Sequence, residues 1–287
     1  MHAVSYITRH RRWPPRLGYG GEGLASPWRW HRGRALPLVR RVLLMHPHLP
    51  EAFDGLTIAQ VSDVHAGQFM TADRLETVRS LVASLAPDLI VFTGDQLDRR
   101  DVDADLFVQG FAGISAPLGV FGILGNHDYL AGRSLALAAL EAAGIQPLVN
   151  HSVFLQRGGH GLLLAGVDDA DAPSPFAPDF SVLWTTSGAF KLLLCHQPRL
   201  WPEAIRHGAD LTLSGHTHGG QISPVGERFS VARLATRFVA GTYLSGSHVL
   251  YVSRGVGVGA VPLRVGTLPE VDLITLHRGR PEKRCEV

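Results

Sequence analysis

Five short apolar runs in this chain each end in aspartate, asparagine or histidine, and this pattern limits the possible folds more than any other feature. The runs are LTIAQVSDVH, DLIVFTGDQLD, GVFGILGNHD, FKLLLCH and ADLTLSGHTH, in that order. Short continuous apolar runs of this kind are typical of buried strands. Helical patterns separate the first three runs, and strands dominate the last third of the chain. This order indicates two packed sheets with helices outside them.

The helical patterns are best defined where apolar residues recur on one face. Within 71–88, Thr71 can cap a helix whose apolar face contains Leu75, Val78, Leu81, Val82 and Leu85. The other predicted helices span 103–113, 132–144 and 200–208. We expect 151–156 and 160–169 to form a hairpin-like pair of strands, and 247–277 to form a β meander.

The residues that follow the five runs are residue types that bind metals in proteins. They are Asp63, His65, Asp95, Asn126, His127, Asp128, His196, His216 and His218. Side chains at the carboxyl ends of strands in such sheets can converge on one site. Imidazole and carboxylate together suit divalent Mn, Fe or Zn, and a carboxylate can bridge two ions about 3.5–4 Å apart. The sequence therefore predicts a site for two metal ions.

The five short motifs that contain these residues resemble a known family signature in their order and spacing. DVH, GDQLD, GNHD, the histidine of LLLCHQP and GHTH are similar to the motifs of the calcineurin-like metallophosphoesterases, over about residues 56–275. LSGHTHGGQ and the ending VSRGVGVGAVPLRVGTLPEVDLITL resemble a bacterial branch that is often membrane-associated. The resemblance implies an α/β fold, a double β-sandwich flanked by helices in four α-β-β-α layers.

The resemblance also implies a role for each residue. Its ligands for one ion are Asp63, His65 and His218. Its ligands for the other ion are Asn126, His196 and His216, with Asp95 bridging the two ions. His127 would stay free of metal and act as a general acid or transition-state stabiliser, with Asp128 orienting it from behind. Asp98 would support the site without binding metal.

The implied reaction is hydrolysis of a phosphomonoester, phosphodiester or pyrophosphate bond by a metal-bound hydroxide, with His127 protonating the departing oxygen. The substrate stays open at this point. A lipid-linked pyrophosphate such as UDP-2,3-diacylglucosamine fits the branch, whereas a soluble phosphatase would take a nucleotide or a phosphoprotein. The alternative outside catalysis is a metal-binding scaffold with the same fold, although no ligand position departs from the motif.

Uneven charge divides the chain into three expected parts. Residues 1–50 contain nine arginines, no lysine and one acidic residue, whereas the rest contains 18 basic and 24 acidic residues. We expect an Arg- and Trp-rich arm at 1–50, a phosphoesterase domain at 51–278 and a charged tail at 279–287. The mildly acidic body argues against a nucleic-acid surface.

The arm has two interpretations, a contact with an anionic membrane surface or a disordered leader. The chain has no apolar run of about 18 residues and no signal-peptide pattern. Its two cysteines cannot make a disulfide framework, which favours a reducing compartment. We therefore expect a cytoplasmic protein that is at most peripheral at the inner face of the membrane.

Several other residues carry both a functional and a structural interpretation. Cys195 is expected to be a small core residue rather than a nucleophile. GVGVGA is expected to be a close-packed loop rather than a phosphate-binding loop, because no helix follows it. Arg254 and Arg264 fit either phosphate binding or a structural role. The histidines expected on the surface or in loops are His46, His48, His151 and His160.

Overall fold

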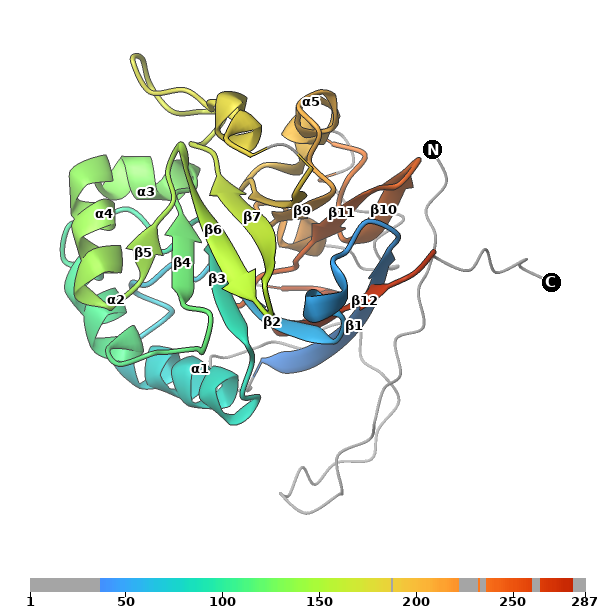
Figure 1. The fold of residues 1–287 in the computed structure, drawn as a ribbon. Helices are drawn as coiled ribbons and strands as arrows, with labels where there is room; N and C mark the ends of the chain where they lie inside the picture. The colour runs from blue at the N-terminus through green and yellow to red at the C-terminus, as the bar shows by residue number, and fades with distance from the viewer. Residues whose placement is uncertain (1–36, 187, 222–231, 233–235, 260–263, 281–287) are drawn as a thin grey trace.

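Two six-stranded sheets form the centre of the structure (Figure 1). The computed structural model describes residues 37–186, 188–221, 232, 236–259 and 264–280. The first sheet contains, in spatial order, β1 (Leu38–His46), β12 (Glu270–Arg278), β2 (Leu56–Val61), β3 (Leu89–Thr93), β4 (Val120–Ile123) and β5 (Gln146–Pro147). The second contains β10 (Gly241–Ser245), β11 (His248–Val252), β9 (Leu211–Ser214), β8 (Phe190–Leu194), β7 (His160–Gly166) and β6 (His151–Arg157).

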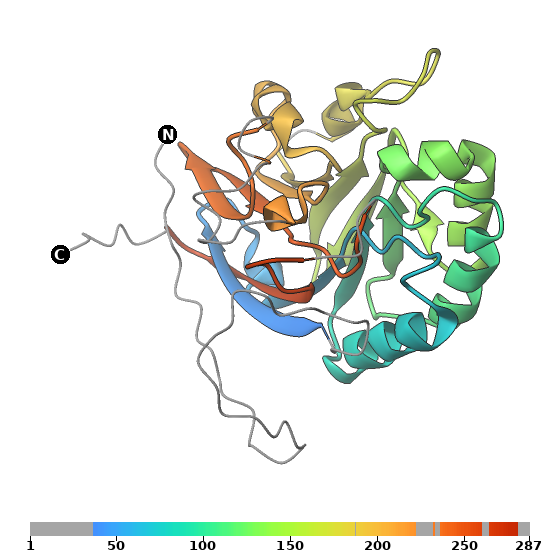
Figure 2. The same cartoon turned by 180° about the vertical axis from the view of Figure 1, so that it is seen from behind.

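Helices cover the outer face of each sheet and complete four layers. The first sheet is covered by α1 (Ala72–Ser84), α2 (Asp103–Phe111) and α4 (Arg133–Ala142), which line one side of the molecule in Figures 1 and 2. The second is covered by α5 (Trp201–Arg206) and the 3-10 helix η2 (Phe180–Trp184). The short α3 (Asn126–Ala131) follows β4. Further 3-10 helices are η1 (Glu51–Phe53), η3 (Pro198–Leu200) and η4 (His218–Gly220). The predicted four-layer α-β-β-α fold is confirmed.

The continuous apolar runs of the sequence are explained by burial on both faces of the sheets. In β3, Leu89 and Val91 pack between the two sheets, whereas Ile90 and Phe92 pack under the helices. A parallel strand covered on both sides needs apolar residues at successive positions rather than at alternate ones. Such runs therefore mark the central strands.

Parallel pairing brings the ends of the five runs to one edge. β2, β3 and β4 are parallel neighbours in the first sheet, and β8 and β9 are parallel neighbours in the second. Their carboxyl ends face the same way within each sheet. The polar residues that follow them are thereby gathered on rigid supports, in the position where ligand sites form in open α/β sheets.

Most predicted elements are present close to their expected bounds. α1 begins after Thr71, although the Thr71 side chain makes no capping hydrogen bond, and Leu75, Val78 and Val82 are buried. The predicted helices at 103–113, 132–144 and 200–208 correspond to α2, α4 and α5. The hairpin-like pair is the antiparallel pair β6–β7.

The β meander expected over 247–277 is wrong. β11 belongs to the second sheet, whereas β12 lies between β1 and β2 in the first. The chain crosses from one sheet to the other at the edge that carries the polar strand ends, where Val256 N–H donates to the Ser62 carbonyl and Gly257 N–H to the Asp63 carbonyl. The crossing segment is therefore part of the surroundings of the site and not a connection between neighbouring strands.

The structure also gives part of the expected arm a place in a sheet. β1 pairs in parallel with β12 over its whole length, with Leu38 opposite Glu270 and His46 opposite Arg278. Residues 1–36 and 281–287 lie outside the described residues. The three-part division at residues 50 and 278 stays a prediction, although β1 lies before the first boundary, within the expected arm, and belongs to the first sheet.

A buried carboxyl group of β12 should make stability depend on pH. Tyr251 Oη, on β11, donates to Asp272 Oδ1 across the sheet interface at 2.6 Å. Burial, with nearby Glu270, raises the pKa of Asp272 from 3.8 to about 8. The native state then keeps a proton that the unfolded state has released. Its contribution to stability is present below pH 3.8 and is lost as the pH rises through about 8.

We expect Asp272→Asn to flatten the loss of stability between pH 5 and pH 8, by up to about 1.4 kcal/mol per pH unit, because the amide cannot ionise. Urea denaturation at several pH values measures this slope. Asp73→Asn, which replaces an exposed carboxylate at the start of α1, is the control and should keep the wild-type slope. Equal slopes for Asp272→Asn and the wild type would contradict the assignment.

Candidate metal centre

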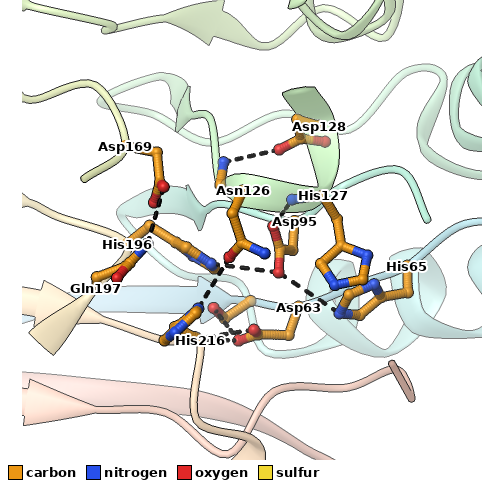
Figure 3. A network of polar contacts seen from close by, with 12 residues as sticks. Asp63, His65, Asp95, Asn126, His127, Asp128, Asp169, His196, Gln197 and His216 are labelled. Carbon is orange, nitrogen blue, oxygen red and sulfur yellow. Dashed lines mark hydrogen bonds and ion pairs between the residues drawn. The ribbon is translucent and has the colours of Figure 1, made fainter. Parts of the chain in front are cut away.

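Side chains from both sheets converge at the shared strand edge (Figure 3). Every residue expected to bind metal lies there. Asp63 and His65 follow β2, Asp95 follows β3, Asn126 begins α3 after β4, His196 follows β8, and His216 and His218 follow β9. The sheets thus bring together residues that are up to 155 positions apart in the sequence, from Asp63 to His218.

One group of possible ligand atoms combines the first sheet with the second. His65 Nε2 lies 3.1 Å from His218 Nε2, and His218 Nε2 lies 3.5 Å from Asp63 Oδ1. Ligand atoms of one tetrahedral ion with bonds of about 2.0–2.1 Å stand roughly 3.4 Å apart. The three side chains therefore have the separations that one divalent ion requires.

A second group lies beside the first. Asp95, His196 and His216 offer ligand atoms within 4.8 Å of one another. His216 Nδ1 lies 2.9 Å from Asn126 Oδ1, which brings the amide oxygen of α3 into the same group. This mixture of imidazole, carboxylate and amide oxygen is suited to divalent transition metals.

Asp95 touches both groups with a single oxygen. Its Oδ2 lies 3.7 Å from His65 Nε2 in the first group and 3.3 Å from His196 Nε2 in the second. Its other oxygen, Oδ1, accepts the backbone N–H of His127 at 2.8 Å. The carboxylate is therefore held in the orientation that a bridging ligand needs.

The position of the His196 ring fits metal binding. Its Nδ1 can only donate to the Thr93 carbonyl, 2.7 Å away, so Nε2 is the nitrogen that carries the lone pair when the ring is neutral. That Nε2 is buried and has no hydrogen-bond partner among the described residues. A buried polar atom without a partner costs about 1–3 kcal/mol, and a divalent ion would supply the missing partner. The residues present therefore fit the divalent ions that the site pattern predicts.

Burial and neighbouring charges set the protonation states of the site. Burial alone would raise the pKa of Asp95, but His196 and His65 outweigh it and hold that pKa well below its usual range. Burial and neighbouring His196 lower the pKa of His216 to about 4, and burial and His65 lower the pKa of His218. His216 and His218 are thus in the neutral form that binds metal. Burial is outweighed by Asp98 at His65 and by Asp95 at His196, which raises the pKa of both rings, so these two rings would release protons when a metal binds.

The backbone at these positions is unusual. Five expected ligands have left-handed φ values: Asp63 at 53°, His65 at 47°, Asp95 at 54°, His216 at 71° and His218 at 51°. A non-glycine residue in this region costs on the order of 1 kcal/mol, and such residues gather at functional sites. The surrounding sheets must therefore provide the stability that holds these side chains inward.

The glycine before the paired histidines has a steric role. A Cβ on Gly215 would overlap Ser62 Oγ and Asp63 Oδ2. The backbone can therefore pass close enough for His216 N–H to donate to Asp63 Oδ1 at 2.9 Å. The glycine in LSGHTHGGQ lets the loop after β9 close over the loop after β2.

The expected contact between Asp128 and His127 is absent, and this detail of the prediction is corrected. Asp128 is the third residue of α3, so its carboxylate folds back and accepts the backbone N–H groups of Gly125 and Leu97, each at 2.9 Å. Asp98 lies beside His127 instead. His127 Nδ1 donates to the Asp98 carbonyl at 2.9 Å and lies 3.4 Å from its carboxylate.

Asp98 also faces His65. Its Oδ1 lies 3.6 Å from His65 Nδ1, on the opposite side of the ring from Nε2. A carboxylate behind a ligating histidine fixes the orientation of the ring and makes it a stronger ligand. The supporting role expected of Asp98 is thus matched by its contacts. Asp128 instead holds the start of α3 to the loop after β3.

The residues with two interpretations are mostly structural. Cys195 is buried, which raises the pKa of its thiol. Arg264 is buried, donates to the Gly257 carbonyl at 2.9 Å and lies 3.1 Å from His218 Nδ1. In GVGVGA, a Cβ on Gly255 or Gly257 would overlap Asp63. Residues 255–259 therefore form a close-packed loop against a proposed ligand.

Two residues beside the site, Gln197 and Asp169, were not predicted from the sequence. Gln197 comes directly after His196, and Asp169 lies beyond the carboxyl end of β7. Gln197 Nε2 donates to Asp169 Oδ1 at 2.8 Å (Figure 3). Burial raises the pKa of Asp169, and nearby His196 opposes this. The VDD that follows β7 resembles the other strand ends, and that similarity was the one signal that could have identified Asp169.

Comparison with known proteins agrees with the site. Residues 56–220 match the family described as calcineurin-like phosphoesterase. An uncharacterized metallophosphoesterase of Aquifex aeolicus (strain VF5) is 36% identical over 227 residues, which cover 77% of this chain and 85% of that protein. The uncharacterized metallophosphoesterase YkuE of Bacillus subtilis (strain 168) is 32% identical over 234 residues, covering 79% and 81%. The crystal structure of TT1561 of Thermus thermophilus covers 71% of this chain and 92% of its own, with 16% identity and a TM-score of 0.48.

The fold and the two groups of histidine and aspartate define a metal-dependent hydrolase of phosphoric esters. The chain belongs to the calcineurin-like metallophosphoesterase family. Within the described residues, no helix has both the length and the apolar character needed to cross a membrane.

Proposed function

We propose that this protein hydrolyses a phosphoric ester or anhydride bond with two divalent ions bound at the metal centre. One ion would be held by Asp63, His65 and His218, and the other by Asn126, His196 and His216, with Asp95 shared. The observation that carries this proposal is the position of Asp95 Oδ2, within 3.7 Å of a nitrogen of each group. Divalent ions in such a site lower the pKa of bound water and hold a phosphoryl oxygen.

His127 is proposed as the proton donor to the departing oxygen. Its backbone N–H is fixed on Asp95, and its Nδ1–H is fixed on the Asp98 carbonyl. The ring therefore keeps one orientation, and Nε2 is the atom that can exchange a proton with substrate. Its side chain is 16% exposed, so it is open to a bound ester without being freely mobile.

An apolar leaving group is the finer proposal for the substrate. α3 begins with Asn126 and His127 and exposes Leu130, whose exposed fraction is 61%. Phe176 is also exposed, and its ring lies 6.1 Å from that of Tyr129 on the same helix. Apolar surface beside a phosphoesterase site supports a lipid-linked pyrophosphate of the UDP-2,3-diacylglucosamine kind. The proposed contact of the basic arm with anionic lipid at the inner membrane face belongs to this same function, although residues 1–36 lie outside the described residues.

A substrate panel tests the proposal. Protein loaded with Mn²⁺ or Zn²⁺ should hydrolyse p-nitrophenyl phosphate or its diester, and a lipid-linked pyrophosphate should be cleaved with a higher kcat/KM than a nucleotide or a phosphopeptide. Leu130→Gln should lower kcat/KM for the lipid-linked substrate alone, because an exposed leucine that binds an alkyl chain contributes about 1–3 kcal/mol, or roughly 10–200-fold. The exposed Val102→Gln is the matched control away from α3.

Each part of this proposal can fail separately. If two ions bind and no ester in the panel is hydrolysed, the metal-binding scaffold is the better description. If Leu130→Gln affects all substrates equally, the apolar leaving group is excluded and the hydrolase stands.

A further inference from the structure

A further group of histidine and aspartate, outside the metal centre, lies at the opposite end of the sheets. It contains His46, the last residue of β1, together with His48 and Asp210. Asp210 comes directly before β9, whereas His216 lies beyond the other end of β9. Six extended residues span roughly 20 Å, so this group is separate from the metal centre.

His46 is buried, contrary to the surface or loop position expected from the sequence. Its exposed fraction is 5%, and its ring packs edge-on against Phe190 with centroids 4.9 Å apart. Its Nε2 is buried and has no hydrogen-bond partner among the described residues. Asp210 Oδ1 is 3.7 Å from this nitrogen, which is beyond hydrogen-bond distance. A buried polar atom in this state is costly unless something binds it.

The separations around Asp210 are those of ligands to one ion. Asp210 Oδ1 lies 3.7 Å from His46 Nε2 and 3.5 Å from His48 Nδ1. Atoms bound to one tetrahedral zinc ion stand roughly 3.4 Å apart, whereas a direct hydrogen bond would bring them to about 2.9 Å. The distances are too long for hydrogen bonds and within a few tenths of an ångström of the metal-ligand spacing.

The carboxylate of Asp210 is already fixed in place. Its other oxygen, Oδ2, accepts the backbone N–H of Lys191 at 2.9 Å, at the start of β8. Oδ1 is thereby left facing the two imidazoles. Ligating carboxylates are commonly oriented in this way by a second hydrogen bond.

From this geometry we propose that His46, His48 and Asp210 bind a divalent transition-metal ion of the zinc class, separate from the metal centre. Two imidazoles and a carboxylate are a ligand set that zinc takes, with water or a fourth side chain completing the tetrahedron. His248 is a candidate for that fourth place, because its Nδ1 donates to the Ala209 carbonyl at 2.7 Å and leaves Nε2 available. Binding has one cost. A ligating His46 carries its proton on Nδ1, so the 3.2 Å contact from His48 N–H to that nitrogen is lost.

The ion would join the two sheets. β1 is an edge strand that pairs with β12, and Asp210 belongs to the opposite sheet. A metal ligated from both would fasten the end of β1 against the start of β9. Because the ion binds the folded chain and not the unfolded one, it would raise the melting temperature. Hydrolysis at the metal centre would not depend on it.

The test compares metal content between the wild-type protein and the variant His48→Gln. His48 has a side-chain exposure of 65%, so its replacement should leave the fold intact. Chelator-treated protein is equilibrated with Zn²⁺, and elemental analysis gives ions per chain. We expect the variant to bind about one ion fewer than the wild type, to lose part of the rise in melting temperature caused by Zn²⁺, and to keep its rate of ester hydrolysis. His160→Gln, an exposed histidine on β7, is the control.

The test depends on the difference in metal ions per chain between the variant and the wild type, and not on the total number of ions that the wild type binds. An equal number of ions in His48→Gln and the wild type would overturn the proposal. A second measurement uses the variant Asp210→Asn and Co²⁺ in place of Zn²⁺, because tetrahedral Co²⁺ absorbs visible light. The tetrahedral Co²⁺ absorption lost in this variant should equal that lost in His48→Gln, and unchanged absorption in both would also exclude the site.

Discussion

Replacing Asp95 by alanine should remove both metal ions from the metal centre and reduce ester hydrolysis by at least about a thousandfold. The reason is that one oxygen of Asp95 lies against ligands of both groups, 3.7 Å from His65 and 3.3 Å from His196. Charge stabilisation by bound ions contributes several kcal/mol to such reactions, and about 4 kcal/mol corresponds to a factor of a thousand. Elemental analysis of the purified variant, together with its rate, measures both effects.

Asp63→Ala is the matched control, because Asp63 belongs to one group alone. It should lose one ion more readily than the other, whereas Asp95→Ala should lose both together. Asp95 also accepts the His127 N–H, so Asp95→Asn separates the two roles. Its amide oxygen keeps that hydrogen bond while the negative charge is lost. Two ions retained in Asp95→Ala would refute the shared-ligand arrangement.

Replacing His127 by glutamine should lower the rate by about 10²–10⁴-fold, the usual contribution of general acid catalysis, while metal content hardly changes. The loss should depend on the leaving group. An ester that releases p-nitrophenolate needs little protonation and should suffer less than an alkyl ester. Measurement of both rates, the metal content and the melting temperature on this one variant distinguishes a proton donor from a metal ligand.

The contact between His127 and Asp98 can be tested with a second variant, Asp98→Asn. Asp98→Asn keeps the backbone carbonyl that holds His127 Nδ1 but removes the charge beside it. We expect a smaller loss than in His127→Gln. The part that acts through His127 should depend on the leaving group, whereas the part that acts through His65 should lower metal content and affect both esters equally. If His127→Gln loses metal and harms both esters equally, His127 is a ligand and the general-acid role is excluded.

The parts of the fold that could be predicted are those in which one strand carries its own signal. β3 is apolar at successive positions because it is buried on both faces, and that pattern is visible in LIVFT without knowledge of its neighbours. The ligand positions could be predicted for a related reason. Polar residues at the carboxyl ends of parallel strands are brought together by the sheet itself, so Asp63, Asp95 and His196 follow from order along the chain.

The parts that could not be predicted depend on which distant segments become neighbours. The sequence of β1 has no clear alternation of apolar and polar residues. Its pairing with β12 and the packing of His46 against Phe190 depend on residues far away in the sequence, so they could not be predicted from the strand itself. The exchange of roles between Asp98 and Asp128 depends on α3 beginning at Asn126, which turns Asp128 back onto backbone N–H groups. Left-handed φ values are several-fold enriched at Asn, Asp and His, but this preference does not tell which of these residues adopt them.

The origin of the metal centre in two separate sheets has a consequence for folding kinetics. Asp63 and His218 follow strands of different sheets, so we expect their loops to meet only after the intervening strands have paired. Such long-range contacts form slowly and late. Bound metal should therefore have little effect on the refolding rate and should instead slow unfolding, because interactions that are absent from the transition state act on the unfolding rate.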